Sequence, residues 1–297
     1  MADVLPIVDT HLHFLDLARF AYPWTEHPDF ASLRRDYLPQ DWQADAGERE
    51  VLAGVHVQAE VDHAIDPAQE TAWLASLPEP VAPMVHVAYA DLRAADLDDV
   101  LARHRAHPAV RGIRQEAWFD PQSTRADIPR VNLLSDPTWR AGLARLPVHG
   151  LSFDLLVWPH QLVHAAEIFA ALPQLAVVVE HTGLPPLGDA AGMQLWRDGL
   201  ARFAATVPHA VLKISAMAFI ASGWTTGVVG PIVREALEIF GPQRCMLGSN
   251  FPVDRGAASY AEIWSGYEQI TADLSAAERT ALFSGTALRT YHIDLAS

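Results

Sequence analysis

The chain has 297 residues, half of them hydrophobic and only 19% charged, which supplies a large core and excludes a disordered protein. Its 36 acidic residues outnumber 21 basic ones and give a formal net charge of −15, so we expect neither nucleic-acid binding nor attraction to an anionic membrane surface. The single cysteine, Cys245, excludes an internal disulfide and a cysteine-rich metal cluster.

Eight short apolar runs recur along the chain, each followed by a segment with helical spacing. The runs are rich in Val, Leu and Ile and nearly continuous, as expected for parallel strands buried on both faces. Eight strands alternating with helices predict an α/β fold, a (β/α)8 TIM barrel formed as one domain by residues 1–297. An open doubly wound sheet would instead place a glycine-rich phosphate loop after the first strand, where this chain has His11-Leu12-His13. The predicted strands are residues 4–9, 52–58, 84–90, 112–116, 152–157, 176–181, 210–215 and 245–250, and the predicted helices include residues 67–76, 97–106, 159–171, 193–205 and 231–240.

Two predicted connections, residues 14–45 and 118–136, are too long to be simple turns. Long connections in a compact domain usually form lids or walls of a functional site, and we expect that role here. The sequence has neither a long uncharged apolar run nor a basic N-terminus followed by an apolar segment. We therefore expect a cytoplasmic protein. Its partner is expected to be a small-molecule substrate, and the sequence does not indicate the oligomeric state.

Ionisable side chains gather where the predicted strands end, which in a barrel is the face that carries the chemistry. The first strand ends in His11-Leu12-His13, and residues two apart on an extended strand face the same way. These histidines can therefore converge on one metal ion or one substrate oxygen. An isolated His-x-His is more often a pair of solvated loop residues, but its position at the end of the first strand favours a functional pair. Further strand-end residues are Gln58, Glu60, His63, Arg114, Gln115, Glu116, Asp154, His160, Glu180, His181, Lys213, Asn250 and Asp254.

In their order and spacing, these motifs resemble the amidohydrolase superfamily (amidohydrolase-related family 2). The nearest branch is the sugar-lactonase-like one that includes L-fuconolactonase, L-rhamnonolactonase and 2-pyrone-4,6-dicarboxylate lactonase. The resemblance implies hydrolysis of a lactone by an activated water, with His11, His13 and His181 around the reacting carbonyl. It spans most of the chain and comprises Val8-Asp9-Thr10-His11-Leu12-His13, Gly112-Ile113-Arg114-Gln115, Phe153-Asp154-Leu155-Leu156, Val179-Glu180-His181-Thr182-Gly183, Leu212-Lys213-Ile214-Ser215 and Gly248-Ser249-Asn250-Phe251-Pro252-Val253-Asp254.

The position after strand eight departs from the family pattern. Relatives usually carry an aspartate before an aromatic-proline pair, whereas this chain has Asn250. An asparagine cannot take a proton from water at neutral pH, so the usual general base is missing or its role has moved. Two residues could replace it: Asp254, if the loop folds back, and His181, since an ordinary histidine pKa of about 6.5 suits proton transfer. For Asp254 the alternative is a helix cap or a salt bridge beside Arg255. The candidate catalytic residues are His11, His13, His181, Asn250 and Asp254.

The resemblance also implies one divalent metal ion, with zinc the first choice, although some related lactonases work without a metal. His11, His13 and His181 would supply three imidazoles and leave a position open for water, and Glu116 could add an oxygen. The two-metal variant of the superfamily needs a carbamylated lysine on strand four, but Lys213, the only lysine, lies on strand seven. We therefore favour one ion, with a metal-free site as the alternative.

Arg114 is the candidate for binding a carboxylate or a polarised carbonyl, because its planar guanidinium suits both. A salt bridge to Glu116 or Glu60 is the alternative. Further candidate substrate-binding residues are Gln115, Trp24 and His160.

Glu180 and Lys213 are expected to support packing. On an extended strand Glu180 would face away from His181, and a buried Lys213 tied to Asp154 or Glu180 would hold the barrel together.

We therefore expect a hydrolase that opens a sugar-acid lactone by attack of an activated water on the ring carbonyl. Two alternatives keep the fold: a metal-dependent decarboxylase, against which Asn250 counts, and an amide or ester hydrolase. The alternative of another class is a non-catalytic binding barrel that has lost its base.

Overall fold

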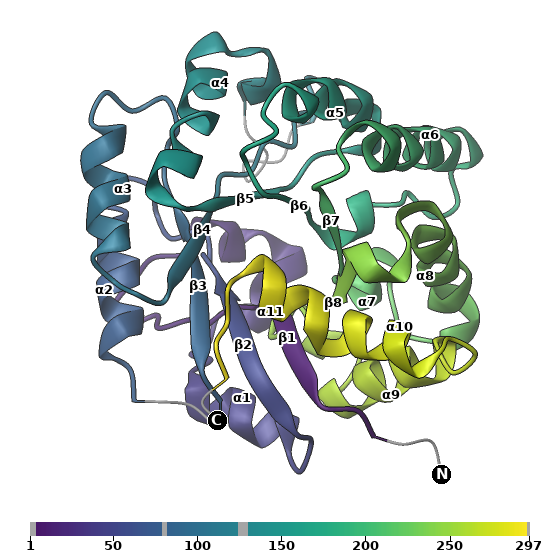
Figure 1. Ribbon diagram of the computed structural model, residues 1–297. Helices are drawn as coiled ribbons and strands as arrows, with labels where there is room; N and C mark the ends of the chain where they lie inside the picture. The colour runs from purple at the N-terminus through teal and green to yellow at the C-terminus, as the bar shows by residue number, and fades with distance from the viewer. Residues whose placement is uncertain (1–3, 79–81, 124–129, 296–297) are drawn as a thin grey trace.

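The computed structural model describes residues 4–78, 82–123 and 130–295, and its centre is a ring of eight parallel strands (Figure 1). The strands are β1 (Ile7–Leu12), β2 (Val51–Val57), β3 (Met84–Tyr89), β4 (Val110–Arg114), β5 (Ser152–Leu155), β6 (Val177–Val179), β7 (Val211–Ile214) and β8 (Cys245–Leu247). Each strand pairs with the next one in the chain. Just beyond the strand ends, the Asn250 N–H donates to the His11 carbonyl at 2.8 Å and the His13 N–H donates to the Phe251 carbonyl at 2.8 Å, which joins β8 to β1. The predicted single-domain TIM barrel is confirmed.

The helices lie outside this ring, as Figure 1 shows. All five predicted helices are present, but the last one is longer than predicted. It starts at Thr226, where the Thr225 side chain accepts from the Val228 N–H, so Pro231 lies inside the helix and does not open it. The α-helices are α1 (Pro39–Ala46), α2 (Ala68–Ser76), α3 (Leu97–Arg105), α4 (Pro137–Leu143), α5 (Leu162–Ala170), α6 (Ala190–Thr206), α7 (Met217–Ile220), α8 (Thr226–Phe240), α9 (Tyr260–Ile270), α10 (Ala276–Thr280) and α11 (Thr286–Thr290).

Every predicted strand is present, but several end earlier than the apolar runs suggest. β6 stops at Val179 and β8 stops at Leu247. The backbone turns left-handed soon afterwards, with φ of 50° at His181 and 59° at Asn250. Non-glycine residues rarely adopt this conformation, and it ends the alternation of side chains that an extended strand would impose. These two turns determine where the polar groups of the site point.

One apolar layer of the barrel interior consists of valines, Ala53 and Met246, packed with residues from the C-terminal segment. Tyr291 follows α11 and donates its hydroxyl hydrogen to Asp154 Oδ2 at 2.7 Å. In Figure 1, α10 and α11 cross in front of the ring. This segment therefore closes the end where the strands begin and leaves the opposite end for the site.

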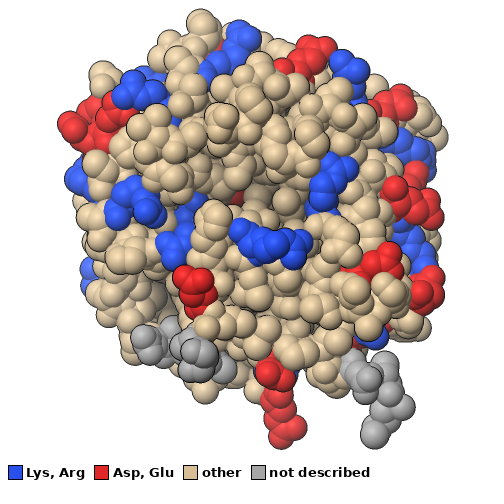
Figure 2. Space-filling view, viewed as in Figure 1, with Lys and Arg blue, Asp and Glu red and all other residues tan. Residues whose placement is uncertain are grey.

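Charged side chains are interspersed on the face that Figure 2 shows, which is viewed as in Figure 1. Acidic and basic groups alternate there between wide areas of other residues. The net charge of −15 is thus not concentrated in one patch on the described part of this face. Among the described residues, no helix has the length and apolar character needed to cross a bilayer.

Candidate active site

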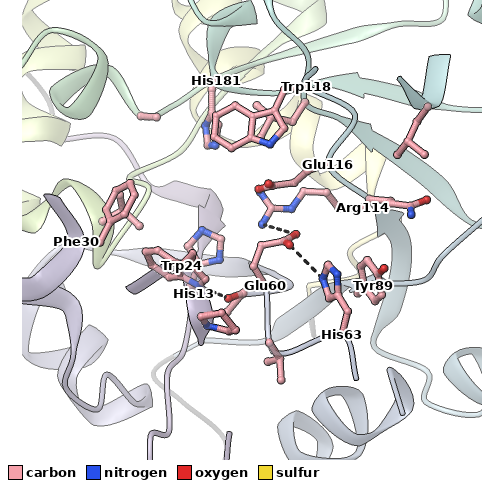
Figure 3. Close-up of a pocket in the computed structure, with 18 of the residues that line it drawn as sticks. His13, Trp24, Phe30, Glu60, His63, Tyr89, Arg114, Glu116, Trp118 and His181 are labelled. Carbon is pink, nitrogen blue, oxygen red and sulfur yellow. Dashed lines mark hydrogen bonds and ion pairs between the residues drawn. The ribbon is translucent and has the colours of Figure 1, made fainter. Parts of the chain in front are cut away.

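A cavity of about 570 Å³ lies at the end of the barrel where the strands stop (Figure 3). Both long connections contribute walls, as expected from their length: Trp24 and Phe30 come from residues 14–45, and Trp118 and Leu133 from residues 118–136. Of the second connection, residues 124–129 lie outside the described part of the chain. The polar residues that line the cavity include His13, Glu60, His63, Arg93, Arg114, Gln115, Glu116, His181 and Asn250, and its aromatic residues are Trp24, Phe30, Tyr89, Trp118 and Phe219.

The two histidines of the His-x-His motif direct ring nitrogens toward each other. Their Nε2 atoms lie 3.1 Å apart. His13 Nδ1 is 2.7 Å from the Val57 carbonyl oxygen, and His11 Nδ1 is 3.2 Å from a carboxylate oxygen of Glu180. The His13 Nδ1 therefore faces an acceptor, whereas the His11 Nδ1 contacts Glu180 without forming a hydrogen bond within the described residues. With a proton on each Nδ1, the two Nε2 lone pairs would face one another. Such an arrangement is repulsive unless a cation or a proton lies between them.

His181 lies beside this pair and is held at one ring nitrogen. Its Nδ1 is 2.9 Å from Ser215 Oγ, and its ring centroid is 4.5 Å from that of His11. Ligand atoms of His11, Glu180 and His181 all lie within 4.8 Å of one another. His13 joins this group through its contact with His11, whereas Glu116 lines the cavity outside it. Glu180, and not Glu116, is thus the carboxylate beside His11 and His181.

Burial keeps all three histidines neutral at neutral pH. Desolvation lowers the pKa of His13 to about 3 and that of His181 to about 4, and it lowers the pKa of His11 well below its ordinary value. Neutral imidazole is the form that binds a metal ion or accepts a proton. The donor set therefore fits a divalent cation of the zinc type, which prefers nitrogen and carboxylate ligands.

Glu180 is central to the polar network behind the cavity, and the expectation that it faces away from His181 is wrong. It is buried, with His11, Arg114 and Lys213 around it: the Arg114 guanidinium lies 3.3 Å away and the Lys213 ammonium 3.4 Å away. The left-handed turn at His181 brings the neighbouring side chains to one side, where an extended strand would separate them. Lys213 also donates to Asp154 at 2.6 Å, which confirms its expected structural role.

Arg114 lines the cavity with its charge balanced by carboxylates. One guanidinium nitrogen donates to the Gln58 carbonyl oxygen at 2.7 Å. In addition to Glu180, Glu116 lies 3.8 Å away and Glu60 lies 4.0 Å away, so the salt bridges considered as the alternative do form. Figure 3 shows Arg114 between Glu116 and Glu60. The surrounding carboxylates fix the position of the guanidinium at the cavity wall.

A second polar group on the same wall had no role assigned from the sequence. The His63 ring stacks on Tyr89 with centroids 3.9 Å apart, and its Nε2 lies 3.1 Å from a Glu60 oxygen, as Figure 3 shows. Burial alone would lower the pKa of His63, but the hydrogen bond and charge of Glu60 outweigh burial and raise it. The sequence could have suggested the pairing of Glu60 with His63 only through their shared position after the second strand. The stacking could not be predicted, because its partner Tyr89 lies on β3.

Asn250 reaches the cavity, whereas Asp254 lies behind it. Asn250 Nδ2 donates to Asp254 Oδ1 at 2.8 Å, and the Ala218 N–H donates to Asp254 Oδ2 at 3.0 Å. Burial raises the pKa of Asp254 to about 7, although these hydrogen bonds partly oppose the change. The loop after β8 does not bring Asp254 to the cavity as replacement of the base would require. Asp254 instead accepts from N–H groups at the start of α7, as a helix cap would, and Arg255 pairs with Asp45 at 3.3 Å. Asp254 is therefore neither paired with Arg255 nor in contact with the cavity.

The three remaining candidates differ in their surroundings. Trp24 forms part of the wall and donates from Nε1 to the Ala59 carbonyl oxygen at 2.8 Å. Gln115 also lines the cavity, but its side-chain oxygen accepts from Trp139 and its nitrogen donates to Asp91, both at 3.0 Å. His160 is exposed and is not among the lining residues, because the chain turns outward after β5. The structure brings Trp24 and Gln115 to the cavity and leaves His160 outside.

Comparison with known proteins identifies the family of the chain. Residues 8–293 match the amidohydrolase family, and the chain belongs to it. It is 33% identical over 297 residues to L-fucono-1,5-lactonase of Burkholderia multivorans, covering 96% of this chain and 95% of that protein. The L-fucono-1,5-lactonase of Burkholderia ambifaria is 26% identical over 303 residues, covering 97% and 96%. A crystal structure of an amidohydrolase from Burkholderia multivorans with bound zinc has a TM-score of 0.83 and 31% identity, covering 98% of this chain and 100% of that one. The protein is a hydrolase of this family.

Proposed function

We propose that the protein hydrolyses a lactone, and that the substrate is the lactone of a sugar acid. The observation that carries the proposal is the convergence of the Nε2 atoms of His11 and His13, which lie 3.1 Å apart beside His181 at the cavity. Relatives at 33% and 26% identity are named L-fucono-1,5-lactonase and align over nearly the whole chain. The aromatic walls formed by Trp24, Phe30 and Trp118 suit the C–H faces of a sugar ring.

The residues that would hold one divalent ion are His11 and His13, through their converging Nε2 atoms, while Glu180 supports His11 from its Nδ1 side and His181 stays free to move a proton. Zinc is the first choice, because the donors are imidazole nitrogens and a carboxylate, and a relative of similar fold has zinc bound. When bound, such an ion polarises a carbonyl oxygen and lowers the pKa of water.

The protein's own groups provide the path for the proton. His181 is neutral, and in the proposed tautomer its Nδ1–H donates to Ser215 Oγ, which leaves Nε2 to accept the proton that leaves the attacking water. The water oxygen forms a new bond to the ring carbonyl carbon, and the bond from that carbon to the ring oxygen then breaks. His181 returns its proton to the departing ring oxygen. Arg114 donates to the carbonyl oxygen while negative charge develops there.

The test is proton release, followed with a pH indicator, from a panel of aldonolactones mixed with the purified protein. We expect rapid release from one stereochemical series, and loss of that activity on dialysis against a chelator, with recovery on adding zinc. His181→Asn should lower kcat by about 100-fold or more, since general acid–base groups contribute that much. His164→Gln is the matched control, because His164 is half-buried on the outer α5 and does not line the cavity.

Two results would contradict the proposal. One is an absence of turnover across the panel with zinc added, in a protein that is folded by circular dichroism. The other is an equal loss of activity in His181→Asn and His164→Gln, which would show that turnover does not depend specifically on the cavity residue His181.

A further inference from the structure

We propose that Asp254 is a positioning residue that fixes the orientation of the Asn250 carboxamide, so that Asn250 presents a hydrogen-bond acceptor to the cavity. This inference rests on the proposed function, because it assigns a task to a residue on the wall of the proposed active site. Asn250 lines the cavity and is only 3% exposed, and Asp254 is buried behind it at 1%. The 2.8 Å hydrogen bond from Asn250 Nδ2 to Asp254 Oδ1 joins them.

Asn250 is also held at its backbone. Its N–H donates to the His11 carbonyl at 2.8 Å, and its carbonyl accepts from the Asp254 N–H at 3.1 Å. Its φ of 59° is left-handed, a conformation that asparagine tolerates better than most residues. With the main chain fixed, the carboxamide can still adopt two orientations, with either its oxygen or its NH₂ group facing the cavity.

The hydrogen bonds of Asp254 determine that choice. Asp254 Oδ2 accepts from the Ala218 N–H at 3.0 Å, at the start of α7, while Oδ1 accepts from Asn250. An ionised carboxylate can only accept, so Asn250 must turn its NH₂ group toward Asp254. The Asn250 oxygen is then left for the cavity, where it can accept a hydrogen bond from water or from a substrate hydroxyl but cannot remove a proton.

The surroundings of Asp254 make this orientation sensitive to its charge. The groups that face it are the Asn250 side chain, the N–H groups of Ala218 and Phe219 from α7, and Tyr267 from α9, while Arg255 is paired with Asp45. Burial raises the pKa of Asp254 to about 7. A protonated Asp254 would donate to the Asn250 oxygen, so the carboxamide would reverse and present its NH₂ group to the cavity.

Asp254→Asn should mimic this protonated form. The two N–H groups of α7 need an acceptor, so the new carboxamide turns its oxygen toward them and its NH₂ group toward Asn250. Asn250 must then reverse. We expect kcat for the lactone to fall by roughly tenfold or more, because a polar group at the cavity then points the wrong way. In the parent protein kcat should decline below about pH 7 as Asp254 takes up a proton, and this decline should be absent from the variant.

The swapped double variant Asn250→Asp/Asp254→Asn distinguishes positioning from a merely structural role. There the carboxamide introduced at position 254 keeps the acceptor for α7 and donates to the new carboxylate at position 250, which again presents an acceptor to the cavity. We expect the double variant to recover about tenfold of the kcat lost in Asp254→Asn. If the hydrogen bond only stabilises the loop, the swap should be no more active than Asp254→Asn or Asn250→Asp alone, which would overturn the proposal.

A readout that needs no turnover separates this inference from the lactonase proposal. The side-chain NH₂ signals of Asn250 can be assigned by NMR from their loss in Asn250→Asp. They should shift with a midpoint near pH 7 in the parent protein and stay constant in Asp254→Asn. A protein inert on every lactone that still shows this titration would refute the lactonase proposal alone. Signals that do not respond to pH, or respond equally in both proteins, would refute the positioning role.

Discussion

Glu180 shows how much the site depends on single buried residues. Its carboxylate is the shared partner of His11, Arg114 and Lys213, all buried around it. Removing one member of a buried ion pair leaves its partner charged and unsatisfied, which is more costly than losing a surface contact. The orientation of His11 and the stability of the barrel therefore depend on the same carboxylate.

We expect Glu180→Gln to lower the free energy of unfolding by about 3–5 kcal/mol and to abolish measurable turnover. The substitution keeps the shape but removes the negative charge between Arg114 and Lys213. Urea unfolding followed by tryptophan fluorescence measures the change. Glu235→Gln is the control, because Glu235 pairs with Arg197 at the surface, and its loss should be far smaller. Equal losses in the two variants would show that burial adds nothing to the Glu180 interactions.

Sequence reasoning at this scale identified side chains that follow a simple strand geometry. His11 on β1 and His13 just after it follow a period of two, and their side chains point to the same side as expected. The direction of Glu180 was predicted wrongly because the same period was extended to residues where the backbone has turned left-handed. The pairing of Asp254 with Asn250 needed the fold of a loop, which no local pattern specifies.

At the scale of single elements, α4 packs closely against the segment that supports one wall of the cavity. A Cβ atom placed on Gly142, inside α4, would overlap the backbone carbonyl of Leu92. The Leu92 N–H donates to Gln115 Oε1 at 3.1 Å, and Gln115 lines the cavity. The glycine therefore permits a close approach between a helix and the β3–α3 connection.

Gly142→Ala should destabilise the protein by about 1–3 kcal/mol, because backbone atoms must move to make room. The gain in helix propensity, about 1 kcal/mol, offsets only part of this loss. Gly227→Ala in the first turn of α8 is the matched control, since no atom lies within 4 Å of its Cβ position, and we expect it to stabilise by about 0.5–1 kcal/mol. Thermal unfolding compares the two; a change of the same sign in both would contradict the packing argument.

Element boundaries were less predictable than the elements themselves. The apolar runs located all eight strands, because parallel strands buried on both faces leave a continuous signal. Pro231 was expected to open a helix, but the Thr225 cap starts α8 earlier. A helix tolerates proline in its first turn and is weakened by proline in its interior, so the sequence favoured a start at Pro231.

At the scale of the whole molecule, the layer between strands and helices contains buried histidines that play no part in the site. His56 on β2 and His86 on β3 are direct neighbours in the parallel register, with ring centroids 5.8 Å apart. They are 0% and 5% exposed, and His86 Nδ1 has no hydrogen-bond partner in the described part of the chain. Burial, with the nearby charges of His107 and Arg111, lowers the pKa of His86 to about 4.

This lowered pKa makes stability depend on pH. Between the folded pKa of about 4 and the unfolded value of 6.5, the unfolded chain binds the His86 proton and the folded protein does not. The stability of the fold is therefore complete above about pH 6.5 and falls as the pH falls toward 4. Buried carboxyls act in the opposite direction over a similar range, since burial raises the pKa of Glu70 to about 7. The contribution of His86 must accordingly be isolated as a difference between two proteins.

His86→Leu replaces the titrating ring with an apolar side chain that suits the same buried position. When the pH is lowered from about 7.5 to about 5, the free energy of unfolding of the variant should rise by about 2 kcal/mol relative to that of the parent protein. The reason is that the unfolded parent is stabilised by protonation of His86, whereas the variant has no such group. Urea unfolding at the two pH values measures this difference, and His164→Leu on the outer surface of α5 is the control, which should change equally at both. A parallel pH dependence in His86→Leu and the parent would mean that acid weakens the fold through other groups, and that the two facing histidines are accommodated without electrostatic cost.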